Sequence, residues 1–130
     1  MALYVADTHS LLWYFFDAPR LGLATQQAFD EVDAGRSTLI VPTIVLAEMI
    51  YVAQAGRLQF DLDMVFESLV NGDNYAIAPF DLTIAQSLRW ATAIPEMHDR
   101  MIACTALHYG ARLITKDPLI QASGLVETIW

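Results

Sequence analysis

The stretch "HDRMIACTALHYGARLITKDP", residues 98–118, has an acidic residue near each end of what reads as buried scaffold. Asp99 opens a largely apolar run with a helical pattern, and Asp117 follows the short apolar strand "RLIT" at residues 112–115, with one residue between them. A carboxylate beside buried scaffold needs a partner that compensates its charge. The stretch therefore predicts a helix and then a strand, with acidic groups gathered where these elements meet.

Outward from this stretch, short apolar strands alternate with helical patterns along the whole chain. The expected strands are residues 2–6, 38–41, 75–80, 112–115 and 126–130. A first helix is expected to start at residue 8, with Thr8 or Ser10 as its cap. Another is opened by Pro42 and Thr43 and runs to residue 56. The other expected helices are residues 24–35, 62–70, 82–94 and 99–110. Strands that are apolar on both sides and alternate with helices are typical of parallel sheets. We expect an α/β fold with a short, mainly parallel sheet of four or five strands and helices on both faces.

The size and the apolar content limit the class of protein. The 130 residues suit a single domain, residues 1–130, and 55% of them are hydrophobic. No apolar run approaches the roughly 18–20 residues that a membrane helix needs, and the N-terminus lacks the basic region of a signal peptide. High apolar content without a membrane span indicates surface buried against a partner, so we expect a homodimer and no membrane association.

Cysteine use and net charge limit the compartment and the partners. A single cysteine, Cys104, excludes an intramolecular disulfide and a multi-cysteine zinc site, so a reducing cytoplasm is the simplest location. Seven basic residues against 15 acidic ones give a net charge of −8, which argues against broad, nonspecific binding of nucleic acid. An acidic chain could still cut nucleic acid if a divalent metal supplied the local positive charge.

Four acidic residues occupy positions where an α/β fold places its functional site. In such folds the site lies beyond the carboxyl ends of the strands, where helices begin. Asp7 follows the first strand directly, and Asp117 follows the fourth. Asp99 shares a helix face with residues 103 and 106, both alanine, so it leans toward the scaffold. Glu48 lies inside an apolar helix, where an acid must be paired, bound to metal or neutral.

Each acid also has a simpler interpretation. Asp commonly caps helices, and Asp117 followed by Pro118 is a good helix start. Glu48 could lie on a surface stripe or pair with a basic residue. Four carboxylates brought close together repel, at about 3 kcal/mol per pair for ~5 Å and an effective dielectric near ~20. A cation would relieve this repulsion, and all-oxygen ligands suit Mg²⁺ or Mn²⁺ better than zinc.

Four segments together resemble a known family. "ADTHSLLWYF" (6–15), "VLAEMI" (45–50), "HDRMIACTA" (98–106) and "LITKDP" (113–118) are similar to the four acidic motifs of PIN-domain proteins, in the same order. With "DAPRL" at residues 17–21, the first motif resembles the toxin branch of that family, the VapC-type ribonucleases of bacterial toxin–antitoxin pairs.

The resemblance implies a PIN-like fold, an Mg²⁺- or Mn²⁺-dependent endoribonuclease activity on RNA, and a cognate antitoxin. By motif match it carries over the four acids, with Thr115 as a polar supporting residue. In the mechanism that we expect, Asp7 and Asp99 chiefly hold the metal, and Glu48 and Asp117 complete the site directly or through water. Arg100 and Lys116 stand beside two of the acids and are candidate contacts to substrate phosphate, although they are as readily solvated side chains.

Rival interpretations stay open. A response-regulator receiver would use a late lysine such as Lys116, but it needs paired acids after its first strand. A haloacid-dehalogenase-type phosphatase needs a second aspartate where His9 stands. A PIN-fold binding module with weak or lost nuclease activity is the more serious rival, because basic residues are few. Aromatic residues at 13–16 exceed what one core face needs, and we expect a dimer or antitoxin interface to bury the remainder.

Overall fold

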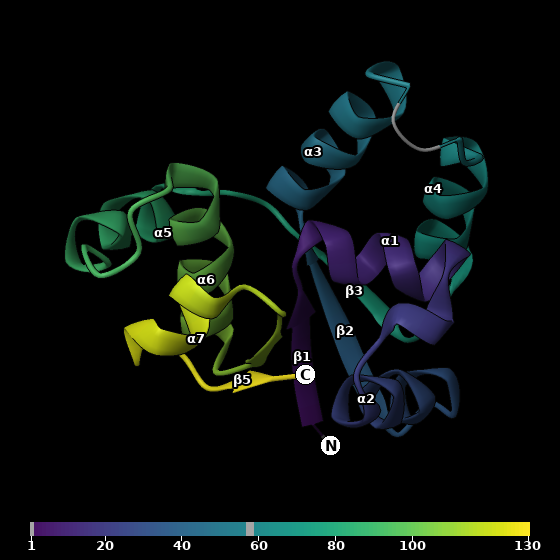
Figure 1. Ribbon diagram of the computed structural model, residues 1–130, viewed down its shortest axis with the longest axis horizontal. Coiled ribbons are helices and arrows are strands. Elements are labelled where there is room, and N and C mark those ends of the chain that lie inside the picture. Colours follow the sequence, from purple (N-terminus) through teal and green to yellow (C-terminus); the bar gives the residue numbers. More distant parts are fainter. Residues whose placement is uncertain (1, 57–58) are drawn as a thin grey trace.

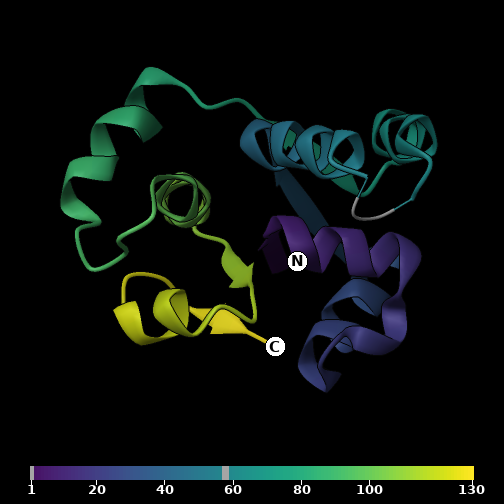
Figure 2. The ribbon, with the colours of Figure 1, turned by 45° about the horizontal axis from the view of Figure 1, so that its top comes forward.

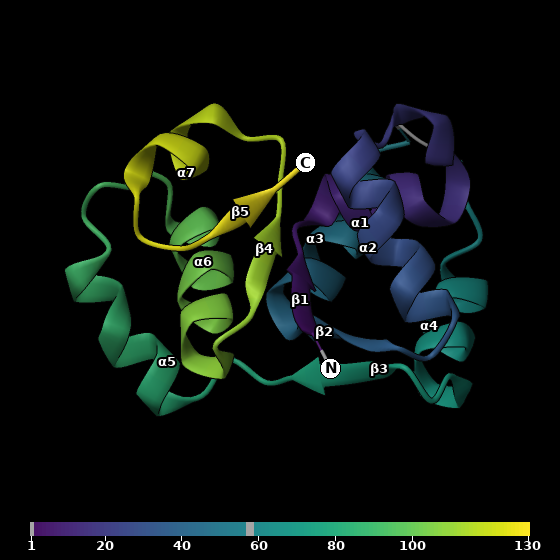
Figure 3. The same ribbon diagram turned by 90° about the horizontal axis from the view of Figure 1, so that it is seen from below.

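A computed structural model describes residues 2–56 and 59–130 (Figure 1). Its sheet has five strands in the order β3-β2-β1-β4-β5, and every neighbouring pair is parallel. The strands are β1 (Ala2–Ala6), β2 (Ser37–Pro42), β3 (Tyr75–Ala78), β4 (Arg112–Ile114) and β5 (Thr128–Ile129). Figure 3 shows β1 between β4 and β2. The predicted α/β fold, with a parallel sheet of four or five strands, is confirmed.

Helices separate the strands along the chain and gather in two groups beside β1. The α-helices are α1 (Thr8–Phe16), α2 (Leu23–Asp33), α3 (Thr43–Gln54), α4 (Leu62–Asn71), α5 (Leu82–Ser87), α6 (Met97–Tyr109) and α7 (Pro118–Ser123). Two 3₁₀ turns, Ala18–Arg20 and Leu88–Trp90, follow α1 and α5. Helices α1 to α4 lie on one side of β1 and α5 to α7 on the other (Figures 1 and 2). In the described part of the chain, no helix is long and apolar enough to cross a bilayer.

The central strands are buried because apolar side chains occupy both of their faces. Val5, Leu39, Leu113 and Ile114 each have no exposed surface. Successive side chains of a strand point to opposite faces, so a strand with apolar residues at consecutive positions must be covered on both sides. Helix α6 packs against β1 and β4, and α2 and α3 pack against β2.

Several predicted elements are shorter than expected, among them the strand predicted for residues 126–130, which is β5 over Thr128–Ile129. The helix predicted for residues 82–94 is α5 up to Ser87 and then a 3₁₀ turn that ends at Trp90. The strand predicted for residues 75–80 stops at Ala78, since Pro79 has no N–H to continue the ladder.

The predicted helix starts also need correction. The cap of α1 is Asp7, whose carboxylate accepts from the Ser10 amide at 2.9 Å, and neither Thr8 nor Ser10 has this role. Helix α6 begins at Met97, two residues earlier than predicted. Its cap is Glu96, which accepts from the Asp99 amide at 2.8 Å. Asp99 therefore lies in the first turn of α6 and is not needed as a cap.

The strand order creates one favoured position for a site. From β1 the chain moves outward through β2 to β3 and then returns to place β4 on the opposite side of β1. In open parallel sheets, ligands bind beyond the carboxyl ends of the strands at the point where the order reverses. That point lies between β1 and β4, which end at Ala6 and Ile114, directly before Asp7 and Thr115.

Candidate functional site

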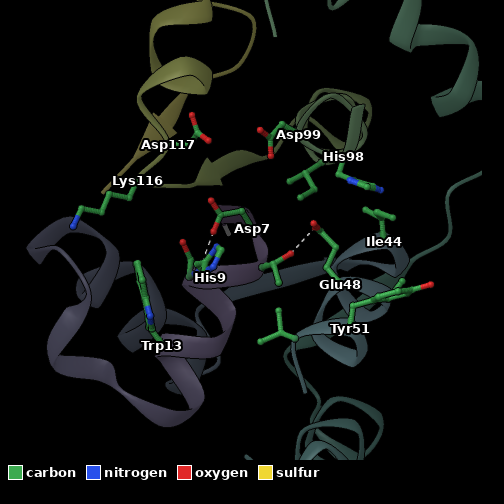
Figure 4. Close-up of a pocket in the computed structure, with 15 residues that line it drawn as sticks. Asp7, His9, Trp13, Ile44, Glu48, Tyr51, His98, Asp99, Lys116 and Asp117 are labelled. Carbon is green, nitrogen blue, oxygen red and sulfur yellow. Dashed lines mark hydrogen bonds between the residues drawn. The ribbon is translucent and has the colours of Figure 1, made fainter. Parts of the chain in front are cut away.

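All four predicted acids line one cavity of about 780 Å³ at the carboxyl end of the sheet (Figure 4). Asp7 comes from the end of β1, Glu48 from α3, Asp99 from α6 and Asp117 from the start of α7. Each acid is half-buried. Segments that are distant in sequence thus bring their carboxylates to a shared space, which is the arrangement that the sequence predicted.

Thr115 connects two of these acids. Its hydroxyl donates to Oδ2 of Asp7 at 2.5 Å and accepts from the Asp117 amide at 3.1 Å. Because Thr115 is fully buried, these two hydrogen bonds satisfy its hydroxyl and fix the ends of β1 and β4 relative to each other. The structure thus places Thr115 where a supporting residue was predicted.

Glu48 is held by a hydroxyl group rather than by a basic residue. The Thr8 hydroxyl donates to Oε1 of Glu48 at 2.7 Å, and Thr8 itself is buried. Within residues 2–56 and 59–130, no Lys, Arg or His lies within salt-bridge distance of Glu48. The described residues therefore do not form the salt bridge between Glu48 and a basic residue that the alternative interpretation requires. Sequence reasoning treated Thr8 as a helix cap and missed this contact.

Asp117 has two roles in the structure. Its Oδ1 accepts from the amides of Leu119 at 2.8 Å and Ile120 at 3.3 Å, so it caps α7. Among the described residues, no hydrogen-bond donor reaches its Oδ2. The capping interpretation is therefore correct for Asp7 and Asp117, and both residues still line the cavity.

The pKa of Asp99 is raised from 3.8 to about 6. Burial is the largest cause, followed by the negative charges of Glu96, Asp117, Glu48 and Asp7. The other three acids of the cavity thus raise the pKa of Asp99 in addition to its burial. This mutual repulsion is the electrostatic property that a bound cation would relieve.

The acids surround the cavity without enclosing a metal by themselves. In the part of the chain that the structure describes, no three Asp, Glu, His or Cys side chains converge closely enough to form a ligand cage. Mg²⁺ commonly binds through one or two carboxylates and keeps several waters, so an open carboxylate set suits it. The Ser10 hydroxyl also lines the cavity, is 1% exposed and has no hydrogen-bond partner among the described residues. Oxygen donors and an unpaired buried hydroxyl fit a hydrated divalent cation.

The two candidate phosphate contacts differ. Lys116 is exposed and lines the cavity. Arg100 is not among the lining residues, and its Nε donates to the Ile94 carbonyl at 2.5 Å. Arg100 therefore stabilises the turn before α6, and its contact to substrate phosphate stays a prediction. His98 lines the cavity with its Nδ1 2.9 Å from Oε1 of Glu96.

The aromatic run at residues 13–16 makes mostly internal contacts. Tyr14 stacks on Phe29 with ring centroids 4.1 Å apart, and its hydroxyl is bonded to Asp33. Phe16 is 39% exposed, and Trp13 lines the cavity. Fewer aromatic side chains of residues 13–16 are therefore free to contact a partner protein than we expected from the sequence.

Comparisons with known proteins agree with this geometry. The family model described as PIN domain matches residues 4–122. Ribonuclease VapC22 of Mycobacterium tuberculosis is 26% identical over 122 residues, which cover 90% of this chain and 88% of that protein.

Solved structures share the fold at lower identity. VapBC2 from Rickettsia felis, solved bound to a DNA fragment from its promoter, matches with a TM-score of 0.72 and 16% identity over 98% of this chain and 97% of that one. A toxin–antitoxin complex from Klebsiella pneumoniae matches with a TM-score of 0.68 and 20% identity over 100% and 97% of the two chains. With the ordered acidic motifs, the parallel sheet and the match to residues 4–122, this chain belongs to the PIN-domain family.

Proposed function

We propose that this protein is a divalent-metal-dependent endoribonuclease and the toxin component of a toxin–antitoxin pair. The observation that carries the proposal is the gathering of Asp7, Glu48, Asp99 and Asp117 around one cavity at the switch point of the sheet. The likeness to a VapC ribonuclease supports RNA as the substrate. The receiver and phosphatase alternatives lose their support, because the PIN-domain model matches residues 4–122.

In this proposal Asp7 and Asp99 hold Mg²⁺ or Mn²⁺, and Glu48 and Asp117 complete the site directly or through water. When bound, the ion would supply Lewis acidity to a phosphoryl oxygen and to water. Thr115 keeps Oδ2 of Asp7 in place, because its hydrogen bond fixes the carboxylate orientation. Thr8 does the same for Oε1 of Glu48, and no donor among the described residues reaches Oε2 of Glu48.

The reaction is hydrolysis of an RNA phosphodiester. A water oxygen attacks phosphorus in line with the bond to the 3′ oxygen. That bond breaks, the 3′ oxygen takes up a proton from solvent and leaves as the 3′-hydroxyl, and the phosphate stays on the 5′ oxygen of the next nucleotide. Glu48 and Asp117 orient the attacking water and accept its proton in this proposal, because each has one carboxylate oxygen that no described donor engages. Asp99, with a pKa of about 6, is mostly ionised at neutral pH and so can bind a cation there.

Partners and location follow from the same proposal. Structures of similar fold were solved as toxin–antitoxin complexes, and we propose a cognate antitoxin for this chain. We also propose a homodimer, supported by the 55% hydrophobic composition and by exposed apolar side chains such as Val70 and Leu82. Residues 1–130 are taken as one PIN domain, and RNA as substrate with one free cysteine suits the cytoplasm.

A second candidate is a PIN-fold binding module with weak or lost nuclease activity. The net charge of −8 and the open arrangement of the acids favour it. Total RNA incubated with Mg²⁺, with and without EDTA, separates the two. The nuclease proposal predicts cleavage by wild type that EDTA and Asp7→Asn both abolish. Binding of RNA without cleavage in every arm would favour the binding module.

A further inference from the structure

An aromatic and cationic cluster forms one wall of the acidic cavity. We call His9, Trp13, Arg20, Lys116 and Trp130 the indole cluster. His9, Trp13 and Lys116 line the cavity directly, and His9 and Lys116 are exposed. In the view of Figure 4, Lys116 and Trp13 lie on one side of the cavity and Tyr51 on the other.

The members of the indole cluster contact one another as rings and cations. The His9 and Trp13 rings are 5.8 Å apart, and Trp130 meets Trp13 edge-on at 5.7 Å. The Arg20 guanidinium lies 4.6 Å from the Trp13 ring centre, and Lys116 Nζ lies 5.9 Å from that of Trp130. Cations over indole faces at these distances are attracted by the ring quadrupole, which holds them beside the cavity.

The positions of the other basic residues make this cluster electrostatically distinct. The chain has seven Lys and Arg, of which the structure describes six. Three of these six bond to other parts of the molecule, since Arg89 and Arg100 donate to carbonyl oxygens and Arg112 to a tyrosine hydroxyl. Among the described Lys and Arg, only Lys116 lines the acidic cavity. An RNA backbone that enters the cavity therefore finds its cationic contact at the indole cluster.

Part of the cluster is fixed through β5, which pairs with β4, the strand that leads to Asp117. Trp130 follows β5, where the Ile129 carbonyl accepts from the Thr115 amide at 3.2 Å. Trp130 also lies so close to Gly22 that a Cβ there would be 2.6 Å from the Trp130 carbonyl carbon. Glycine at position 22 thus lets the indole approach the backbone and sets its place beside Trp13.

Single-stranded RNA is recognised by such surfaces, because its unpaired bases stack on aromatic rings while cations contact phosphate. We propose that the indole cluster is the subsite for the nucleotide next to the scissile phosphate. The base of this nucleotide stacks against His9 and Trp13, and Lys116 contacts the phosphate of the same nucleotide. This inference rests on the proposed ribonuclease function and adds residues that bind substrate outside the four acids.

Fluorescence titration of a short single-stranded RNA that carries 2-aminopurine tests the subsite in an Asp99→Asn background with Mg²⁺, where cleavage is prevented. Trp13→Leu should weaken binding by roughly 5- to 100-fold, the range that loss of one stacked base gives. Lys116→Ala should lower the slope of log K against log salt by about 0.7, as loss of one phosphate contact to a single strand does. The control is Trp90→Leu, which removes an indole that is 68% exposed with Arg89 4.9 Å from its ring centre, outside the acidic cavity.

The outcomes separate the subsite from the nuclease function. The subsite proposal would be overturned if Trp13→Leu and Lys116→Ala both bound RNA with the same affinity and the same salt slope as Trp90→Leu. Cleavage by wild type with unchanged kcat/KM in Trp13→Leu and Lys116→Ala would do the same and leave the nuclease function standing. Loss of RNA binding in the cluster variants while wild type does not cleave would support the RNA contact and refute the nuclease. Thermal melts check that Trp13→Leu is folded. Lys116→Ala is an independent second test, because Lys116 is exposed and its substitution should not affect folding.

Discussion

Asp99→Asn should make the metal-free protein more stable while it abolishes RNA cleavage. Asp99 is a proposed metal ligand whose ionisation is opposed by burial and by four neighbouring carboxylates. Asparagine has nearly the same shape and no charge. Since Glu96 caps α6, the substitution removes no helix cap. The Asp99 carboxylate is thus expected to lower the free energy of unfolding of the metal-free protein, although the proposed function needs it.

The magnitude follows from the raised pKa. A carboxyl with a pKa of about 6 in the folded state and 3.8 when unfolded binds its proton more tightly in the folded state. Its contribution is therefore fully favourable below about pH 4 and is lost as the pH rises through about 6. A shift of about two pKa units corresponds to ~3 kcal/mol, which solvent screening of this half-exposed group reduces to ~1–2 kcal/mol. For a chain of this length, that is an increase in Tm of about 4–7 °C at pH 7.5.

The assay is thermal unfolding in EDTA at pH 4 and pH 7.5, followed by circular dichroism. Asp30→Asn is the matched control, because it removes one negative charge from an exposed position on α2 and should change stability by less than about 0.5 kcal/mol. We expect Asp99→Asn to exceed wild type at pH 7.5 and to match it near pH 4. Equal stability at pH 7.5, or the same difference at both pH values, would refute the reasoning about the acidic cavity.

Four further predictions follow from the same contacts. Millimolar Mg²⁺ should raise the Tm of wild type but not that of Asp99→Asn. At an Mg²⁺ concentration of 100 times the Kd, the free energy of unfolding should increase by about 2.7 kcal/mol, and an unchanged wild-type melt would count against a metal site. Thr115→Val should cost about 1–3 kcal/mol in urea unfolding, because it leaves the half-buried Asp117 amide unpaired, whereas Thr115→Ser should stay near wild type. Asp7→Ala should lose about 1 kcal/mol relative to Asp7→Asn, which keeps the cap of α1, and equal stabilities of the two would argue against that cap. Gly22→Ala should cost about 1–3 kcal/mol and change the near-ultraviolet circular dichroism, because its Cβ displaces Trp130; an unchanged spectrum would contradict the close approach.

The sequence predicted the sheet well because local patterns determine it. Val5 and Leu113 lie in short apolar runs bounded by polar residues, and such runs indicate buried parallel strands wherever helices alternate with them. The end of α5 was predicted too late because the helical pattern of residues 82–94 continues past Trp90.

The candidate site was predictable as a set of residues but not as a set of contacts. Motif order gave Asp7, Glu48, Asp99 and Asp117, and the structure places all four on one cavity; their catalytic role stays a prediction. The hydrogen bond from Thr8 to Glu48 joins positions 40 residues apart, so no local pattern reveals it.

Two further contacts could not be predicted from the sequence, because they also depend on the fold. The pairing of Trp13 with Trp130 depends on strand order, which brings the two ends of the described chain together. Arg100 stands beside Asp99 in sequence, yet its side chain reaches back to the turn before α6. Neighbours in sequence on a helix do not share a face, and only the fold decides which of them meets the cavity.

The most direct test of the central claim is the anomalous scattering of Mn²⁺ in crystals of this protein. We expect a strong anomalous peak in the cavity, within coordination distance of the Asp7 and Asp99 carboxylates, and we expect this peak to be lost in crystals of Asp99→Asn. A Mn²⁺ peak elsewhere on the molecule with none at these acids, while the same preparation still cleaves RNA, would contradict the claim.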